Sequence, residues 1–188
     1  YRLARQLEVC VIDGQRLFGN GMCLPAGPLR EPISRLKQVD FVVVNGADSA
    51  PLDNLSGAIP MRLEPKFLIN LVTGEKRPFG GAPFNIGNTL QAVSAIGNPQ
   101  RFYDLLEKLP YPMQPFSFPD HHLFTDEDFQ SRGIDEHQPV VMTEKDAVKC
   151  RSFARNNYWY LSTELVLPAE FLNDFVSKIK VLAKDSSS

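Results

Sequence analysis

Residues 140–151 read VVMTEKDAVKCR, and this stretch decides the class of fold. Val140–Thr143 is a short apolar run of strand length, and a helix is expected directly after it, over Asp146–Asn156. Leu90–Ile96 is a similar apolar run, and Asn98 can cap a helix that follows it. Strands that alternate with helices in this way predict an α/β layered fold with a largely parallel sheet.

Toward the start of the chain, three further apolar segments predict strands. They are Leu7–Ile12, Phe41–Val44 and Ile59–Glu64. Uninterrupted apolar runs suit strands of a parallel sheet that is covered on both faces. Residues 14–32, between the first two strands, are rich in glycine and proline, so we expect a long irregular loop there. Loops of this length inside a compact domain usually carry function.

A predicted hairpin separates two βα series. It covers Phe67–Arg77 with a turn at Thr73-Gly74, and a stretch rich in Gly, Pro and Asn follows it. We therefore expect residues 1–64 to form one lobe, residues 65–89 a two-stranded linker with its loop, and residues 90–188 a smaller α/β lobe.

Two further segments have a predicted environment. Met113–Phe118 contains Pro115, which cannot donate a ladder hydrogen bond, so this strand is expected at a sheet edge. The last helix is expected over Pro168–Lys184, and its apolar face should combine Leu172, Phe175, Ile179 and Leu182. Such a face is more often part of a core than a membrane contact. Thr125, with Asp128 three residues later, predicts the start of a short helix that runs to Arg132.

Composition limits the possible functions. The chain has 188 residues with 43% hydrophobic and 22% charged residues, which is ordinary for a globular protein. The net charge of −2 gives no basic field, so we do not expect nucleic acid as a partner. The three cysteines show no C-x-x-C spacing, so no metal site is expected.

The string Phe118-Pro119-Asp120-His121-His122 carries the sharpest candidate residues. It follows a strand, and catalytic groups gather at the carboxyl ends of strands in open α/β sheets. A histidine can accept the proton of a reacting hydroxyl at neutral pH. We take His121 and Asp120 as catalytic candidates, although adjacent side chains need not face each other. The alternative is a polar, capped strand exit, and the role of His122 is left open.

The loop after the first strand carries candidate binding residues. Asp13 ends that strand, where a carboxylate can bind a hydroxyl or a magnesium-bound phosphate, or can simply close an Asx turn. Arg16 and Arg30 can bind phosphate through their forked guanidinium groups, and Asn20 is a further polar candidate. Glu31 offers Arg30 a surface ion pair instead.

A third candidate group follows the strand Val140–Thr143. Lys145 and Asp146 stand where a nucleotide can be bound. The alternative for Thr143 and Asp146 is a helix N-cap, and that pattern favours Lys145 as the ligand contact.

Five motifs in order resemble one enzyme family. They are CVIDGQRLFGNGMCLPAGPLREP (10–32), NLVTGEKRP (70–78), AIGNPQRF (95–102), FPDHHLFT (118–125) and VVMTEKDAVKCR (140–151). Together they resemble tetraacyldisaccharide 4′-kinase, the lipid A 4′-kinase of Gram-negative bacteria. The resemblance implies a P-loop-kinase-like fold with a core lobe, a smaller C-terminal lobe and a two-stranded linker.

The resemblance also implies an activity. It implies ATP and Mg²⁺ as cofactors, a tetraacyldisaccharide 1-phosphate as the lipid A precursor substrate, and peripheral contact with the cytoplasmic face of the inner membrane. It places His121 in the active site, with an acidic partner upstream of Tyr1. The family carries a P-loop, but no Gly-x-x-x-x-Gly-Lys-Ser/Thr occurs in this chain. We expect a fragment with an incomplete first lobe that is inactive alone.

Two other functions stay open at this point. The Asp-His-His string is similar to that of DHH metal-dependent phosphoesterases, although the further Asp motifs of a two-metal site are not found. A non-catalytic remnant that binds a lipid or a partner is the other alternative.

Overall fold

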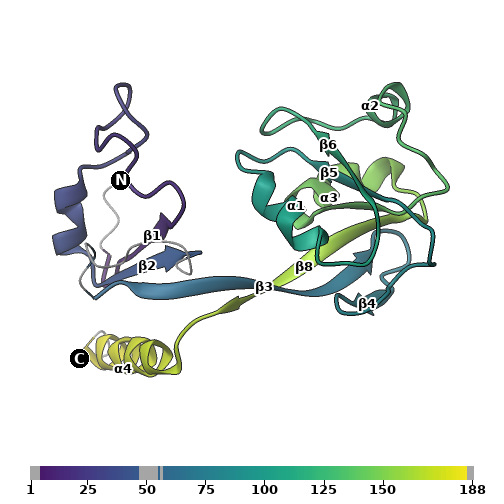
Figure 1. Ribbon diagram of the computed structural model, residues 1–188. Coiled ribbons are helices and arrows are strands. Elements are labelled where there is room, and N and C mark those ends of the chain that lie inside the picture. Colours follow the sequence, from purple (N-terminus) through teal and green to yellow (C-terminus); the bar gives the residue numbers. More distant parts are fainter. Residues whose placement is uncertain (1–4, 47–54, 56, 186–188) are drawn as a thin grey trace. The chain divides into compact units, whose positions relative to one another are not determined.

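The computed structural model describes residues 5–46, 55 and 57–185, and it divides the chain into two units. Unit 1 comprises residues 1–64 and 165–188, and unit 2 comprises Pro65–Glu164. Both boundaries fall inside strands, β3 (Ile59–Asn70) and β8 (Tyr158–Val166), so these two strands connect the units (Figure 1).

Unit 1 is built on parallel strands. Strand β1 (Val9–Asp13) pairs with β2 (Phe41–Asn45), which pairs with the first residues of β3. The loop after β1 is irregular until a short 3-10 helix, η1 (Ile33–Gln38). Helix α4 (Ala169–Asp185) packs Phe171 with the buried Val43 and Met61, and Phe41 lies against this cluster.

Unit 2 contains the strand order β3-β8-β7-β5-β6, with β4 paired to β3. The new strands are β4 (Lys76–Pro78), β5 (Leu90–Ser94), β6 (Met113–Ser117) and β7 (Val140–Thr143). The helices are α1 (Gln100–Leu106), α2 (Asp126–Ser131), α3 (Glu144–Cys150) and the 3-10 helix η4 (Arg151–Phe153). Strands β6, β5, β7 and β8 pair in parallel, so their carboxyl ends share one edge.

Buried side chains cover both faces of the sheet in unit 2. Alternate residues of a strand point to opposite sides, and here they belong to two different clusters. Ala92 and Val141 belong to one cluster, together with Phe102 and Leu106 of α1. Their neighbours along the strands belong to the other cluster, which also contains residues of α2 and α3: Val93, Val140, Met142, Phe129, Ala147 and Cys150. These apolar strands of unit 2 are therefore buried on both sides. In unit 1 the expectation of two covered faces was wrong for β1, because Val9 and Val11 are 40% and 60% exposed.

Several expectations are confirmed. The fold is an α/β layered fold with a mostly parallel sheet. Strand β6, with Pro115, ends the strand order at an edge. Thr125 and Asp128 form a reciprocal capping box at the start of α2.

The contacts divide the chain at other points than the sequence suggests. Residues 65–89 are not a separate linker, because Leu68, Phe79 and Phe84 are buried in the core of unit 2. The last helix does not belong with residues 90–164, because Phe171 packs in unit 1.

Two local predictions were wrong. The apolar face of α4 is centred on Phe171 and Phe175, whereas Leu172 and Ile179 are 45% and 44% exposed. Asn98 does not cap α1, because Pro99 occupies the N-cap position without a side-chain hydrogen bond.

Candidate functional site

A β-turn follows strand β6 and carries the Asp-His-His string. The N–H of His122 donates to the carbonyl of Pro119 at 3.1 Å, which closes the turn over Asp120 and His121. His121 has φ of 63°, and Asp120 has no positive φ, which is the pattern of a type II turn. Glycine normally takes this third position, and a residue with a side chain costs roughly 1–2 kcal/mol there. A residue that is held there at this cost is a candidate for function.

The turn presents the His121 imidazole to solvent, with its side chain 76% exposed. The backbone below it is bonded: the N–H of His121 donates to Asp120 Oδ1 at 3.0 Å and to the carbonyl of Ala95 at 3.3 Å. Ala95 follows β5, so the turn is bonded to the carboxyl end of the neighbouring strand.

Asp120 lies between two cationic or titratable side chains. His121 Nε2 is 3.7 Å from Asp120 Oδ2, and Lys145 Nζ is 3.7 Å from Asp120 Oδ1. A Cβ atom built on Gly97 would lie 3.5 Å from the same carboxylate, so Gly97 borders it as well. These residues come from the ends of β5, β6 and β7, where ligands collect in such sheets. The structure therefore brings together Asp120, His121 and Lys145.

Asp146 is in a different position from its neighbour Lys145. Its side chain is fully buried, and Oδ2 accepts from the N–H of Ala95 at 3.0 Å and from Thr143 Oγ1 at 2.7 Å. Lys149 Nζ lies 3.0 Å from Oδ1. In the structure the Asp146 side chain therefore fixes the end of β5 to α3, which is a structural role rather than a ligand contact. The N-cap interpretation of Thr143 is confirmed, since its hydroxyl accepts from the N–H of Asp146.

His122 points into the protein, unlike His121. Its ring stacks on Phe118 with centroids 5.0 Å apart, and its Nε2 lies 3.1 Å from Asp128 Oδ2. The pKa of Asp128 is lowered, first by the N–H of Thr125 and then by His122. Sequence reasoning did not find this pair, although the capping box at Thr125 already marked Asp128 as a fixed carboxylate.

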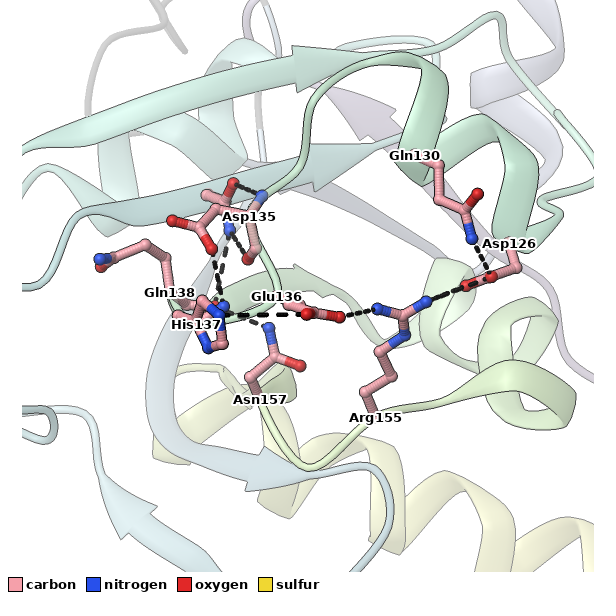
Figure 2. Close-up of polar contacts among 9 residues, drawn as sticks. Asp126, Gln130, Asp135, Glu136, His137, Gln138, Arg155 and Asn157 are labelled. Atoms are coloured by element: carbon pink, nitrogen blue, oxygen red, sulfur yellow. Dashed lines mark hydrogen bonds and ion pairs between the residues drawn. The ribbon is translucent and has the colours of Figure 1, made fainter.

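A polar network holds the far side of α2. Arg155 donates to Glu136 Oε2 at 2.6 Å and to Asp126 Oδ1 at 3.0 Å, so it ties the start of α2 to the loop before β7. Figure 2 shows this bridge beside the side chains of Asp135 and Asn157. These contacts hold α2 against the loop before β7, and we assign no ligand contact to the residues that make them.

The loop after β1 in unit 1 holds the other predicted residues. Asp13 Oδ1 accepts from the N–H of Gln15 at 2.9 Å, which is the Asx turn that the sequence left as the alternative. Asn20 donates to the carbonyl of Ala26 and accepts from the N–H of Met22, so its amide braces the loop. Arg16 and Arg30 are exposed.

A cavity of about 660 Å³ lies along β1 in the same unit. Asp13 and Arg30 line it, whereas Arg16 and Asn20 do not. Apolar residues of β1 and of the loop supply much of its wall, namely Val9, Val11, Leu17, Phe18, Leu29, Ile33 and Leu36. The structure thus places two of the four predicted loop residues at one hollow.

The charges around this cavity pair in a way the sequence did not predict. Arg35 contacts both Glu8, at 2.5 Å, and Glu31, at 3.3 Å. Glu31 therefore forms an ion pair with Arg35, whereas the sequence suggested Arg30 as its partner. The hydrogen bond from Arg5, which has the largest effect, and the hydrogen bond from Arg35 both lower the pKa of Glu8.

The family model described as tetraacyldisaccharide-1-P 4′-kinase matches residues 1–180. The chain belongs to this family. The tetraacyldisaccharide 4′-kinase of Pseudomonas aeruginosa (strain LESB58) is 46% identical over 182 residues, which are 97% of this chain and 52% of the relative. That of Legionella pneumophila (strain Lens) is 46% identical over 177 residues, 94% of this chain and 50% of the relative.

This member of the tetraacyldisaccharide 4′-kinase family spans about half the length of the curated relatives it matches. One solved structure shares its fold. The crystal structure of LpxK from Aquifex aeolicus in complex with ATP matches with a TM-score of 0.64 and 24% identity, covering 94% of this chain and 53% of that one. The α/β fold class is thereby confirmed a second time.

Over residues 5–46, 55 and 57–185, no three His, Cys, Asp or Glu side chains are grouped as a metal site would require. Across the same part of the chain, no helix has both the length and the apolarity needed to cross a membrane.

Proposed function

We propose that a full-length enzyme containing this chain transfers the γ-phosphoryl group of ATP to the 4′-hydroxyl of a tetraacyldisaccharide 1-phosphate, a step of lipid A biosynthesis. The observation that carries the proposal is the family match over residues 1–180, supported by relatives of that name at 46% identity. The ATP complex of the solved LpxK structure supports ATP as the phosphoryl donor.

His121 is the proposed general base. Its exposed imidazole accepts the proton of the 4′-hydroxyl as the hydroxyl oxygen forms a bond to the γ-phosphorus. The bond from the γ-phosphorus to the bridging oxygen breaks, and ADP leaves with that electron pair. Asp120, whose Oδ2 lies 3.7 Å from Nε2 of the ring, is proposed to restrain the direction of the imidazole.

Basic groups of the chain are proposed to hold phosphates. Lys145 stands beside Asp120 at the same sheet edge and would neutralise charge on the transferred group. Arg30, at the cavity of unit 1, can hold a phosphate with Asp13 as a hydroxyl acceptor. Arg16 and Asn20 belong to the same loop, and for Asn20 we propose a bracing role on account of its loop hydrogen bonds.

The donor set fits magnesium only together with a nucleotide. Mg²⁺ is typically bound by one or two carboxylates plus phosphates and water, not by an all-protein cage. Asp13 and Asp120 are single carboxylates at strand ends, and each could contribute one such ligand. The ion would draw charge from the phosphoryl oxygens when it is bound.

The family match favours this kinase over a DHH phosphoesterase. A DHH phosphoesterase rests on one Asp-His-His string, whereas the kinase rests on a match along nearly the whole chain. In unit 2 the string is a turn whose second histidine is used internally. Peripheral contact with the cytoplasmic face of the inner membrane follows from a lipid substrate, and we propose it for the full-length enzyme.

Substitution of His121 tests the proposal. In a full-length enzyme that contains this chain, His121→Ala should lower kcat by about 10²–10⁴-fold with a smaller change in KM, because a general base acts in the transition state. His137→Ala is the matched control, since His137 is 84% exposed in a polar loop. An unchanged kcat in His121→Ala would remove His121 from catalysis.

The chain alone provides a second test. Nothing in its 188 residues matches the P-loop that cradles the β- and γ-phosphates, so the isolated chain should not phosphorylate the lipid. Product formation by the isolated chain above a no-enzyme control would contradict this.

A further inference from the structure

The turn that carries His121 must be held from outside, because its backbone conformation is unfavourable for a residue with a side chain. His121 has φ of 63°, and its own imidazole extends into solvent. The ring therefore cannot hold the turn. Besides the hydrogen bond from the His121 N–H to the carbonyl of Ala95, the side chains on either side of the turn can hold it.

His122 closes the turn from its far end. Its ring lies on Phe118, the residue before Pro119, with centroids 5.0 Å apart and planes 28° from parallel. Phe124 meets the same imidazole edge to face at 5.2 Å. Residues 118 and 122 flank the turn, so this stacking joins the strand that enters it to the segment that leaves it.

Asp128 fixes the direction of the His122 ring. Its Oδ2 lies 3.1 Å from His122 Nε2 and also accepts from the N–H of Thr125 at 2.8 Å and from Thr125 Oγ1 at 2.9 Å. The carboxylate is thus part of the cap of α2. Arg155 holds the start of that helix through Asp126, so the hydrogen-bond partner of His122 is itself anchored.

We propose that His122 and Asp128 are positioning residues, which hold the turn over Asp120 and His121 in the conformation that presents the His121 imidazole to substrate. The proposal rests on the proposed role of His121. Neither residue touches the reacting atoms; both act through the backbone of the turn.

Two replacements of His122 separate its contacts. His122→Phe keeps a ring on Phe118 but removes the hydrogen bond to Asp128, whereas His122→Gln keeps a donor at a similar reach without the ring. In the full-length enzyme, His122→Phe should lower kcat about ten-fold with KM nearly unchanged, which corresponds to the loss of one hydrogen bond. His122→Gln should recover part of the loss, because it keeps a hydrogen bond from residue 122 to Asp128.

A stability-matched control separates positioning from simple destabilisation. Thr125→Ala removes one donor to Asp128 Oδ2, the Thr125 hydroxyl, and keeps the donor from the Thr125 N–H and the contact with His122 Nε2. It should lower the unfolding midpoint and leave kcat unchanged at temperatures where the enzyme is folded. Equal kcat losses in Thr125→Ala and His122→Phe would overturn the proposal.

A double mutant tests whether His122 acts through His121. If it does, His121→Ala and the double variant His121→Ala with His122→Phe should have the same kcat, because no base remains to be positioned. A further ten-fold drop in the double variant would contradict the positioning role.

A structural measurement keeps this inference separate from the proposed function. The HN–Hα coupling of His121, measured by NMR, reports its φ and should change in His122→Phe but not in Thr125→Ala. An unchanged kcat in His121→Ala would remove the catalytic assignment while leaving this coupling result standing. An unchanged coupling in His122→Phe overturns the inference, whatever the result for His121.

Discussion

The loop after β1 in unit 1 and the turn after β6 in unit 2 both follow the carboxyl end of a parallel strand, and they are built in opposite ways. The loop borders a cavity of about 660 Å³ and keeps Arg30 exposed. The turn is short, and the N–H groups of His121 and His122 donate to acceptors on Asp120, Ala95 and Pro119. A long open loop suits the binding of a large substrate, whereas a short supported turn suits the placement of one reacting group.

The buried cores that carry the turn and the loop differ as well. The turn lies next to a cluster of buried residues that includes Phe118, Phe129 and Met142. The core of unit 1 combines Val43, Met61 and Phe171, while Val11 of β1 is 60% exposed. We therefore expect unit 2 to be the more stable unit, and the predictions below test that difference.

The largest expected contrast is in cysteine reactivity. Burial, above all, and the charge of Asp146 raise the pKa of Cys150 to about 12, so its thiolate fraction at pH 8 is about 10⁻⁴. Cys23 is half-buried in the loop of unit 1. Alkylation by iodoacetamide should modify Cys23 at least about a thousand-fold faster than Cys150, as followed by mass spectrometry of peptides. Comparable rates in native buffer would show that unit 2 opens as readily as unit 1.

The next largest effect is expected at Asp146. Asp146→Ala leaves Lys149 and the N–H of Ala95 without their carboxylate partner and should destabilise unit 2 by about 3–5 kcal/mol. Trp159 is the single tryptophan and is buried in unit 2, so its fluorescence can follow urea unfolding. Glu144→Ala, an exposed change in the same helical turn, is the control and should stay within about 0.5 kcal/mol. Equal midpoints for the two variants would argue against Asp146 as a support of β5.

A smaller loss is expected from the core of unit 1. Phe171→Ala removes an edge-to-face contact with Phe41 at 5.1 Å and should cost about 3 kcal/mol, since Phe171 is 8% exposed. Amide exchange of β1 and β2 should quicken, while the Trp159 transition stays in place. Leu172→Ala is the matched control, because its side chain is 45% exposed and should matter little. A larger effect at Leu172 would restore the apolar face that the sequence predicts.

Local patterns allowed most of the fold to be predicted. The strand at Val140–Thr143 and the capping box at Thr125 depend on neighbours within a few residues, and the structure confirms both. The face of α4 depends on Phe41, which lies more than a hundred residues away in the sequence, so helical periodicity alone chose the wrong stripe.

The candidate site was predictable in its location but not in its construction. The Asp-His-His string marked the turn, yet no glycine or asparagine indicated the left-handed backbone of His121. The two adjacent histidines differ because Asp128 bonds only His122, and Asp128 reaches His122 only when α2 has formed. The sequence left a ligand contact and a helix cap open for Asp146, and only the structure shows that its buried carboxylate also supports β5 through the N–H of Ala95.

The smallest expected effect concerns an exposed ion pair in unit 1. Lys178 Nζ lies 2.6 Å from Asp40 Oδ1, and this contact, followed by the N–H of Glu8, lowers the pKa of Asp40 below its usual 3.8. A carboxyl group with a depressed folded pKa stabilises the protein above its unfolded pKa, and the contribution is lost as the pH falls through the folded value.

Lys178→Met should therefore lower the thermal midpoint of unit 1 slightly at pH 7 in low salt, and the difference from the parent should shrink as the pH falls below about 4. High salt should shrink it as well, because exposed ion pairs are screened. Lys178 Nζ also lies 5.2 Å from the centre of the Phe41 ring. Lys178→Arg keeps a cation there, so its thermal midpoint should be close to that of the parent. A difference that persists unchanged at pH 2 would assign the effect to packing of the lysine stem on Phe41, and the ion pair would then contribute nothing to the stability of unit 1.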